Sequence, residues 1–170
     1  WGASCNADGM AAMYSGFHGE TYTCPAEISE ARYGMTVQRY SVNDLDHGGH
    51  GQFRGGAGVC IEYRMEDDSW LTFAYGRFDQ PPWPLDGGHP GTTNYVQVLR
   101  NGMETGEKMQ QGTGILLHKG DIVRIVTAVG AGYGQPNKRD PERVIADVKN
   151  QLITSEEALA VYGVTVGRAP

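Results

Sequence analysis

The amino-acid sequence predicts a mainly β domain with glycine-rich loops and two short C-terminal helices. Glycine fills 25 of 170 positions and gathers in loops such as 46–58. Residues 59–65 alternate apolar and polar side chains with the period of a half-buried strand. Signals for helix starts stand near the end of the chain, from Asp140 onward. Because 39% of residues are hydrophobic, we expect a single folded domain over residues 1–170.

The first half of the chain predicts an irregular start followed by strands. Glycines interrupt every periodic pattern in residues 1–25, so we expect no regular element there. A β-rich body then covers residues 26–130 and begins with a strand at 31–40. A second strand is predicted at 58–65, and a short acidic turn should connect it to a strand at 70–75 in a hairpin.

Proline and glycine dominate the next loop, residues 80–91. Proline fixes φ and has no amide hydrogen, so this stretch should be extended, near polyproline II, rather than a central strand. Residues 95–100 should form a strand that turns at the hairpin dipeptide 101–102. Two further strands, at 115–117 and 122–129, flank another tight turn.

The character of the chain changes to helical over residues 140–163. An aspartate followed by a proline predicts the start of a helix over 141–150. Thr154 and Glu157 have the spacing of a capping box, and Gly163 is a natural C-terminal stop. A second short helix should therefore close the chain.

Charge and cysteine content exclude several classes of protein. The net charge is −6 and the basic residues form no stripe, which argues against nucleic acid as a partner. The sequence has no apolar run of the length that a membrane span needs, so we expect a protein of the cytoplasm. Its cysteines are Cys5, Cys24 and Cys60, an odd number without a Cys-x-x-Cys pair. This predicts neither a disulfide framework nor a structural zinc site.

A group of carboxylates and imidazoles, Asp44, Asp46, His47 and His50, suggests a metal site. The two histidines lie in a glycine loop rather than on a rigid element, and spacing alone supplies no second shell of supporting residues. We therefore interpret His47 and His50 as loop or interface residues and keep them only as weak candidates for metal ligands.

Two other patterns lack the features that chemistry requires. The run at 130–134 has glycines like a dinucleotide-binding loop, but Gln135 stands at the third glycine position and no crossover helix follows. We expect a loop packed closely against a neighbour. No serine lies in a nucleophile elbow. The acid and base candidates, which nothing in the sequence pairs, are Glu27, Glu62, Asp86, His89 and Asp121.

Several motifs together are specific, in order and in spacing. They are 25–33, 53–58 running into 62–64, Arg77 with 82–83, 87–91, 119–121, 132–136, 139–142, Val144, 147–148 and 162–164. With these motifs the chain resembles the C-terminal part of hydantoinase B-type proteins. That family includes B components of ATP-dependent N-methylhydantoinases and 5-oxoprolinases, and the corresponding subunits of acetone and acetophenone carboxylases.

The resemblance implies a barrel-like β-sheet domain with polyproline II-like segments. It also implies a hetero-oligomer, in which an A-type component binds ATP and Mg and phosphorylates a small carbonyl substrate. The B-type component, including an N-terminal region outside this chain, would shape the reaction chamber; a divalent metal in the complex is not assigned to this chain. Catalytic residues stay unknown. The signature residues expected to line or support the chamber are Arg54, Gly55, Gly56, Gly58, Trp83, Gly87, Gly88, Gly132, Tyr133 and Gly134.

The resemblance leaves alternatives for the reaction. The family usually has Asp-Ser-Gly-Gly where this chain has Asp46-His47-Gly48-Gly49, which weakens the metal interpretation further. Arg32-Tyr33-Gly34 lacks the proline that hydantoin-cleaving relatives have after the aromatic residue, which favours ketone carboxylation. Hydrolysis of a cyclic amide is the alternative. Two rivals of other classes are a noncatalytic interaction subunit and an independent metal enzyme that uses His47 and His50.

Overall fold

The computed structural model describes residues 1–13, 24–100 and 103–167. Its helices and strands are α1 (Ala26–Tyr33), β1 (Met35–Val42), β2 (Val59–Met65), β3 (Ser69–Ala74), β4 (Tyr95–Arg100), β5 (Met103–Met109), β6 (Gln111–Leu117), β7 (Ile122–Val126), the 3₁₀ turn η1 (Pro136–Lys138), α2 (Pro141–Lys149) and α3 (Ser155–Tyr162). The mainly β class is thus confirmed. Residues 1–13 form neither helix nor strand, as predicted for this part of the irregular segment.

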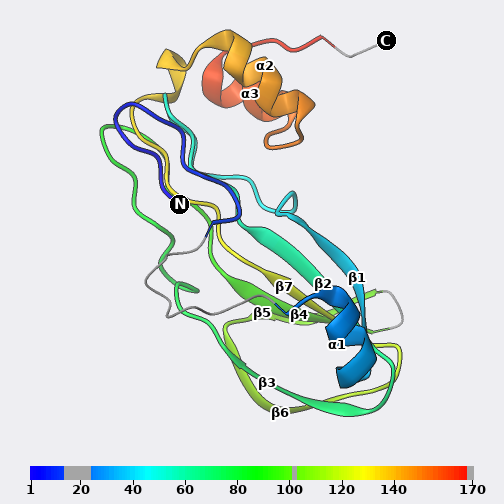
Figure 1. The fold of residues 1–170 in the computed structure, drawn as a ribbon. Coiled ribbons are helices and arrows are strands. Elements are labelled where there is room, and N and C mark those ends of the chain that lie inside the picture. The colour runs from blue at the N-terminus through cyan, green and yellow to red at the C-terminus, as the bar shows by residue number, and fades with distance from the viewer. Residues whose placement is uncertain (14–23, 101–102, 168–170) are drawn as a thin grey trace.

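The strands of the described residues form two open antiparallel sheets. The larger has the order β1-β2-β7-β4-β5, and the smaller pairs β3 with β6. The main hydrophobic core includes buried Val96, Val98 and Val123 of the large sheet and Leu117 of the small one. The expected barrel-like arrangement does not close, because no described strand pairs across the two sheets. Figure 1 shows the β3–β6 ribbon and α1 at one end of the molecule and α2 with α3 at the other.

The predicted hairpin between 58–65 and 70–75 is wrong. Strand β3 pairs with β6, with Ser69 opposite Leu117, and it makes no ladder with β2. The end of β2 is held instead by the turn at 118–121: the Met65 amide donates to the Asp121 carbonyl, and the Gly120 amide donates to the Met65 carbonyl. Alternation of apolar residues sets the face that a strand buries but not its partner, so the sequence pattern fitted both pairings.

The predicted strand at 31–40 begins too early. Helix α1 occupies its first residues and ends at Gly34, whose φ of +60° is the left-handed conformation that glycine adopts at helix ends. Strand β1 starts at the next residue. Helix α1 is short and its buried residue is Ser29, so it has no apolar stripe with helical period, and the pattern alone favoured a continuous strand.

The two C-terminal helices are confirmed with their predicted caps. The Asp140 side chain accepts a hydrogen bond from the Glu142 amide, and Thr154 and Glu157 form both bonds of the capping box. Gly163 ends α3 with φ +71°. The helices share a small hydrophobic core of Val144, Ile153, Ala158 and Tyr162.

The remaining predictions have mixed outcomes. Residues 80–91 form no strand beyond one isolated bridge from Leu85 to Tyr133. The dipeptide 101–102 lies outside the described residues, although β4 and β5 pair on either side of it. All three cysteines are free, and only Cys60 is buried. Within the described part of the chain, no helix is long and apolar enough to cross a membrane.

Glycine-rich segments pack backbone against backbone between the large sheet and the C-terminal helices. We call this region the glycine stack; it consists of residues 1–12, 48–58, 85–92 and 129–134. Backbone hydrogen bonds connect its layers, including Gly56 N–H to the Trp1 carbonyl, Gly130 N–H to the Gly56 carbonyl and Gly132 N–H to the His89 carbonyl. The contacts leave no space for side chains, because a Cβ on Gly55 would lie 1.9 Å from the Gly130 carbonyl oxygen. The glycines therefore act as the core residues of this region.

Replacing Gly132 by Ala should destabilise the protein by about 3 kcal/mol, since overpacking a filled core costs about 1–3 kcal/mol or more. A Cβ at this position would meet the His50 carbonyl oxygen at 2.1 Å. Urea unfolding followed by tryptophan fluorescence measures the effect. Gly76→Ala is the matched control, because a Cβ there has no neighbour within 4 Å, and its stability should change by less than about 0.5 kcal/mol. Equal stability of the two variants would refute the steric explanation.

Candidate functional site

The structure brings most of the predicted signature residues together in the glycine stack. Gly55 and Gly56 lie in its second segment, Gly88 in its third, and Gly132 with Tyr133 in its fourth. Tyr133 exchanges two backbone hydrogen bonds with Phe53, and a Cβ on Gly88 would collide with the Gly132 carbonyl. Gly58 instead borders the large sheet, where a Cβ would lie 2.1 Å from the Thr127 carbonyl oxygen.

Three other signature residues lie at the margin of the stack. Gly87 and Gly134 adopt positive φ, +84° and +73°, in turns beside glutamine side chains. Trp83 projects outward with 71% of its surface exposed, and the Arg77 guanidinium lies over its ring, 5.4 Å from the centroid. The predicted set is therefore not one cluster: it divides into a buried backbone scaffold and an exposed aromatic residue.

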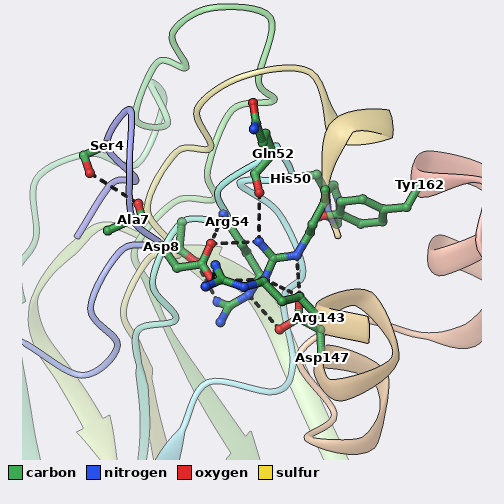
Figure 2. Close-up of polar contacts among 11 residues, drawn as sticks. Ser4, Ala7, Asp8, His50, Gln52, Arg54, Arg143, Asp147 and Tyr162 are labelled. Carbon is green, nitrogen blue, oxygen red and sulfur yellow. Dashed lines mark hydrogen bonds and ion pairs between the residues drawn. The ribbon is translucent and has the colours of Figure 1, made fainter. Parts of the chain in front are cut away.

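The main polar centre of the region is a buried guanidinium, that of Arg139, whose side chain is 1% exposed. Its Nε donates to Asp147 Oδ2 at 3.0 Å, and Nη1 donates to Asp8 Oδ1 at 2.7 Å and to the Gln52 carbonyl at 3.1 Å. Figure 2 shows that Asp8, Gln52 and Asp147 reach this point from the N-terminal segment, the glycine loop and α2. One side chain thus joins three parts of the chain that are distant in sequence.

Arg54 completes this centre from the glycine loop. Its Nε lies 3.3 Å from Asp147 Oδ1, and its backbone amide donates to Asp8 Oδ1 at 2.7 Å. Its Nη1 donates to the carbonyl of Gly55 at 2.7 Å. We call Asp8, Arg54, Arg139 and Asp147 the arginine cluster. Two cations and two anions balance in it, which is the condition under which buried charges are tolerated.

The protonation states follow from these contacts. Burial raises the pKa of Asp8, but the hydrogen bonds from Arg139 and from the Arg54 amide outweigh burial and hold that pKa below its ordinary value. Burial lowers the pKa of Arg139, and its bonds to Asp8 together with the Asp147 charge raise it further than burial lowers it. Asp8 and Arg139 are therefore ionised at neutral pH, and the side chains of the cluster pair with one another, which indicates a scaffold rather than a reacting centre.

The two candidate metal ligands contact the last helix instead. His47 Nδ1 lies 2.7 Å from Glu157 Oε2, and His50 Nδ1 lies 3.1 Å from the Tyr162 hydroxyl. Burial lowers the pKa of His50, so its ring is neutral at neutral pH, and burial raises the pKa of Tyr162 to about 12. Both histidines thus connect the glycine loop to α3 through side-chain contacts. Among the side chains that the structure describes, no three His, Cys, Asp or Glu gather as a metal site would require.

The acid and base candidates of the sequence are dispersed. Glu62 pairs with Arg124 at 2.7 Å on the large sheet, and Asp121 pairs with Arg100 beside the turn after β6. Glu27 lies in the first turn of α1, and Asp86 is exposed with φ +51°. His89 is exposed and meets only the edge of the His50 ring among the aromatic side chains described, at 5.8 Å. The structure does not bring these five residues together.

An apolar cleft of about 410 Å³ lies between the two sheets and α1. Its walls include Tyr33, Tyr63, Met65 and the exposed Trp70. This cleft could receive an apolar group. The pairing of β3 with β6 places Trp70 and Leu117 in the wall of this cleft.

Sequence reasoning missed the arginine cluster as a unit. Arg139 and Asp147 fell within signature motifs but not among the site residues, and Asp8 was not singled out. Asp8 stands in an irregular segment 131 positions from Arg139. No periodicity or spacing connects them. Asp8 and Asp147 each stand between apolar or glycine neighbours, which was the available signal, whereas Arg139 stands between Lys138 and Asp140 and gave none.

Replacing Asp8 by Asn should lower the free energy of unfolding by about 2 kcal/mol at neutral pH, because bonds between charged groups contribute about 1.5–3 kcal/mol. The folded pKa of Asp8 lies below its ordinary value of 3.8. The stabilisation is therefore present above about pH 4 and is lost as the pH falls through the folded pKa.

Urea unfolding between pH 7 and pH 3 tests this expectation, and the variant should lose less stability with acid than the parent. Asp140→Asn is the matched control, since asparagine caps a helix as well as aspartate does. Parallel pH profiles for parent and Asp8→Asn protein would contradict the assignment.

Comparison with known proteins gives consistent results. The model of the Hydantoinase B/oxoprolinase family matches residues 1–136. The B component of a putative D-/L-hydantoinase from Pseudomonas sp. (strain NS671) is 31% identical over 98% of this chain and 28% of its own length. The ATP-dependent caprolactamase of Pseudomonas jessenii, a crystal structure, has TM-score 0.71 and 28% identity over 85% of this chain and 25% of that one.

A nucleotide-free acetone carboxylase structure shares the fold, with TM-score 0.79 and 19% identity over 99% of this chain and 26% of that one. The chain thus spans about a quarter of the length of these relatives. The family match covers the N-terminal segment, the glycine stack and both sheets. On this evidence the chain belongs to the hydantoinase B/oxoprolinase family.

Proposed function

We propose that this chain is part of the B-type component of an ATP-dependent enzyme that opens a cyclic amide by hydrolysis. One observation carries the proposal: the chain aligns over 98% of its length with the B component of a putative hydantoinase. The caprolactamase structure, at 28% identity, supports the same reaction class. One water would supply a hydroxyl to the carbonyl carbon and a proton to the nitrogen, and a second water would be consumed overall as ATP is converted to ADP and phosphate.

The chain's part in this reaction is to build and fix a wall of the reaction chamber. The arginine cluster neutralises itself and the glycine stack is filled by its own backbone, which are properties of a rigid support. The open clefts beside these regions are the surfaces left for substrate and for other parts of the enzyme. ATP and Mg would be bound by an A-type partner, and an N-terminal region of the B-type component would complete the chamber.

Ketone carboxylation is the second candidate, and the Arg32-Tyr33-Gly34 sequence favours it. The structure gives Gly34 a different explanation, because φ +60° at the end of α1 requires glycine and is closed to proline. The likeness to acetone carboxylase, at 19% identity, concerns the fold. We place amide hydrolysis first because of the 31% identity to the hydantoinase component over 98% of this chain.

The test is to coexpress the full-length protein that contains this chain with its A-type partner and to measure ADP release. We expect ADP release and ring opening with a hydantoin or 5-oxoproline, and none when the A-type partner is omitted. ADP release only with a ketone and bicarbonate would replace hydrolysis by carboxylation. A stable complex that is inactive on every substrate would favour the noncatalytic interaction subunit.

A further inference from the structure

Arg77 is held in an unusual backbone conformation at the end of the segment that follows β3. Its φ is +55°, in the left-handed region that non-glycine residues seldom adopt. Asn94 holds this conformation through two hydrogen bonds to consecutive carbonyl groups. Its backbone amide donates to the Arg77 carbonyl at 3.2 Å, and its side chain donates to the Gly76 carbonyl at 2.8 Å. Strain of this kind persists where the surroundings enforce it, and it concentrates at binding sites.

The contacts of the next residue, Phe78, explain how this conformation positions the Arg77 side chain. Phe78 packs against the buried cluster of Cys60, Tyr95 and Val126, so the chain is anchored immediately after Arg77. The side chain of Arg77 is left exposed and lies over the Trp83 ring, 5.4 Å from its centroid. Trp83 stands in a proline-rich loop that limits its movement. The guanidinium is therefore stacked on one face, while its N–H groups at the edge stay available.

Charge pairing sets Arg77 apart from most described arginines. Those that pair with carboxylates are Arg39, Arg54, Arg64, Arg100, Arg124, Arg139 and Arg143. Arg77 forms no ion pair with any carboxylate of the described residues. A guanidinium that is pre-positioned by stacking and lacks a carboxylate is suited to bind an oxyanion through two parallel N–H bonds.

Arg77 lines more than one hollow of the protein surface. The largest has a volume of about 660 Å³, and its other walls include Tyr40, Tyr75 and Asn94. No Asp, Glu or Lys is among the described residues that line it. A second hollow of about 530 Å³ contains Asp79, whose charge would repel an anion there. The larger hollow therefore combines an available guanidinium with aromatic walls that fit an apolar or planar body.

We propose that Arg77, stacked on Trp83, binds the oxyanion of a small organic ligand whose body occupies the 660 Å³ hollow. The ligand class is a carboxylate or a phosphate ester with an apolar or planar body. The identification of this ligand with the carboxylate product or the phosphorylated form of a carbonyl substrate rests on the proposed function; the binding site itself does not.

The experiment is isothermal titration of the full-length protein with benzoate and with phenyl phosphate, without ATP or a partner protein, at constant ionic strength set by chloride. We expect saturable binding of at least one of the two, and the stronger arm tells a carboxylate site from a phosphate site. Arg77→Asn should weaken that binding at least tenfold, because asparagine tolerates positive φ but has no charge. Arg77→Lys, which keeps the charge and loses the planar fork, should be intermediate.

Arg32→Gln is the matched control, since Arg32 is also exposed and forms no ion pair with a described carboxylate, and it should bind like the parent. Thermal unfolding of each variant verifies that the fold is kept. Absence of binding to the parent protein, or equal affinity in parent and Arg77→Asn protein, would overturn the proposal. Because the titration contains no ATP, it measures anion binding separately from catalysis. Failure of the enzyme to hydrolyse a cyclic amide therefore does not change the interpretation of the binding result.

Discussion

The arrangement of the rest of the chain depends on the hydrogen bonds of one buried guanidinium, that of Arg139. It is bonded at once to the N-terminal segment through Asp8, to the glycine loop through Gln52 and to α2 through Asp147. Loss of both carboxylate partners would leave this charge buried without compensation, which costs about 3–5 kcal/mol. Around it, the glycine stack fixes the same segments by contacts that only glycine permits. The hydrogen bonds of Arg139 and the close packing of the glycine stack thus both connect the N-terminal segment to the glycine loop.

This organisation explains why the prominent glycine loop is not itself a reacting centre. Its histidines hold α3, its arginine joins the buried cluster, and its glycines contact the neighbouring backbones. Open surfaces are found at the apolar cleft between the sheets and at Arg77. The relatives that the chain matches are about four times its length.

Features determined by neighbouring residues could be predicted from the sequence. The caps at Asp140 and Thr154 and the stop at Gly163 involve bonds across a few positions, and all are present. Features determined by distant residues could not. Strand β3 alternates as well for a hairpin with β2 as for its observed pairing with β6, and nothing local relates Asp8 to Arg139. The glycines of the stack were recognised as devices for close approach, but their partner segments became known only with the fold.

The position of Arg139 along the chain has a consequence for how the protein is made. The N-terminal segment is held by backbone bonds to residues 54–57 and 131 and by the carboxylate of Asp8 on Arg139. During synthesis, strands β1 and β2 can pair early, but Asp8 lacks its Arg139 partner until 131 further residues have been made. We therefore expect residues 1–12 to dock fully only after the turn that carries Arg139 and helix α2 have been made, which makes this later segment decisive for completing the fold.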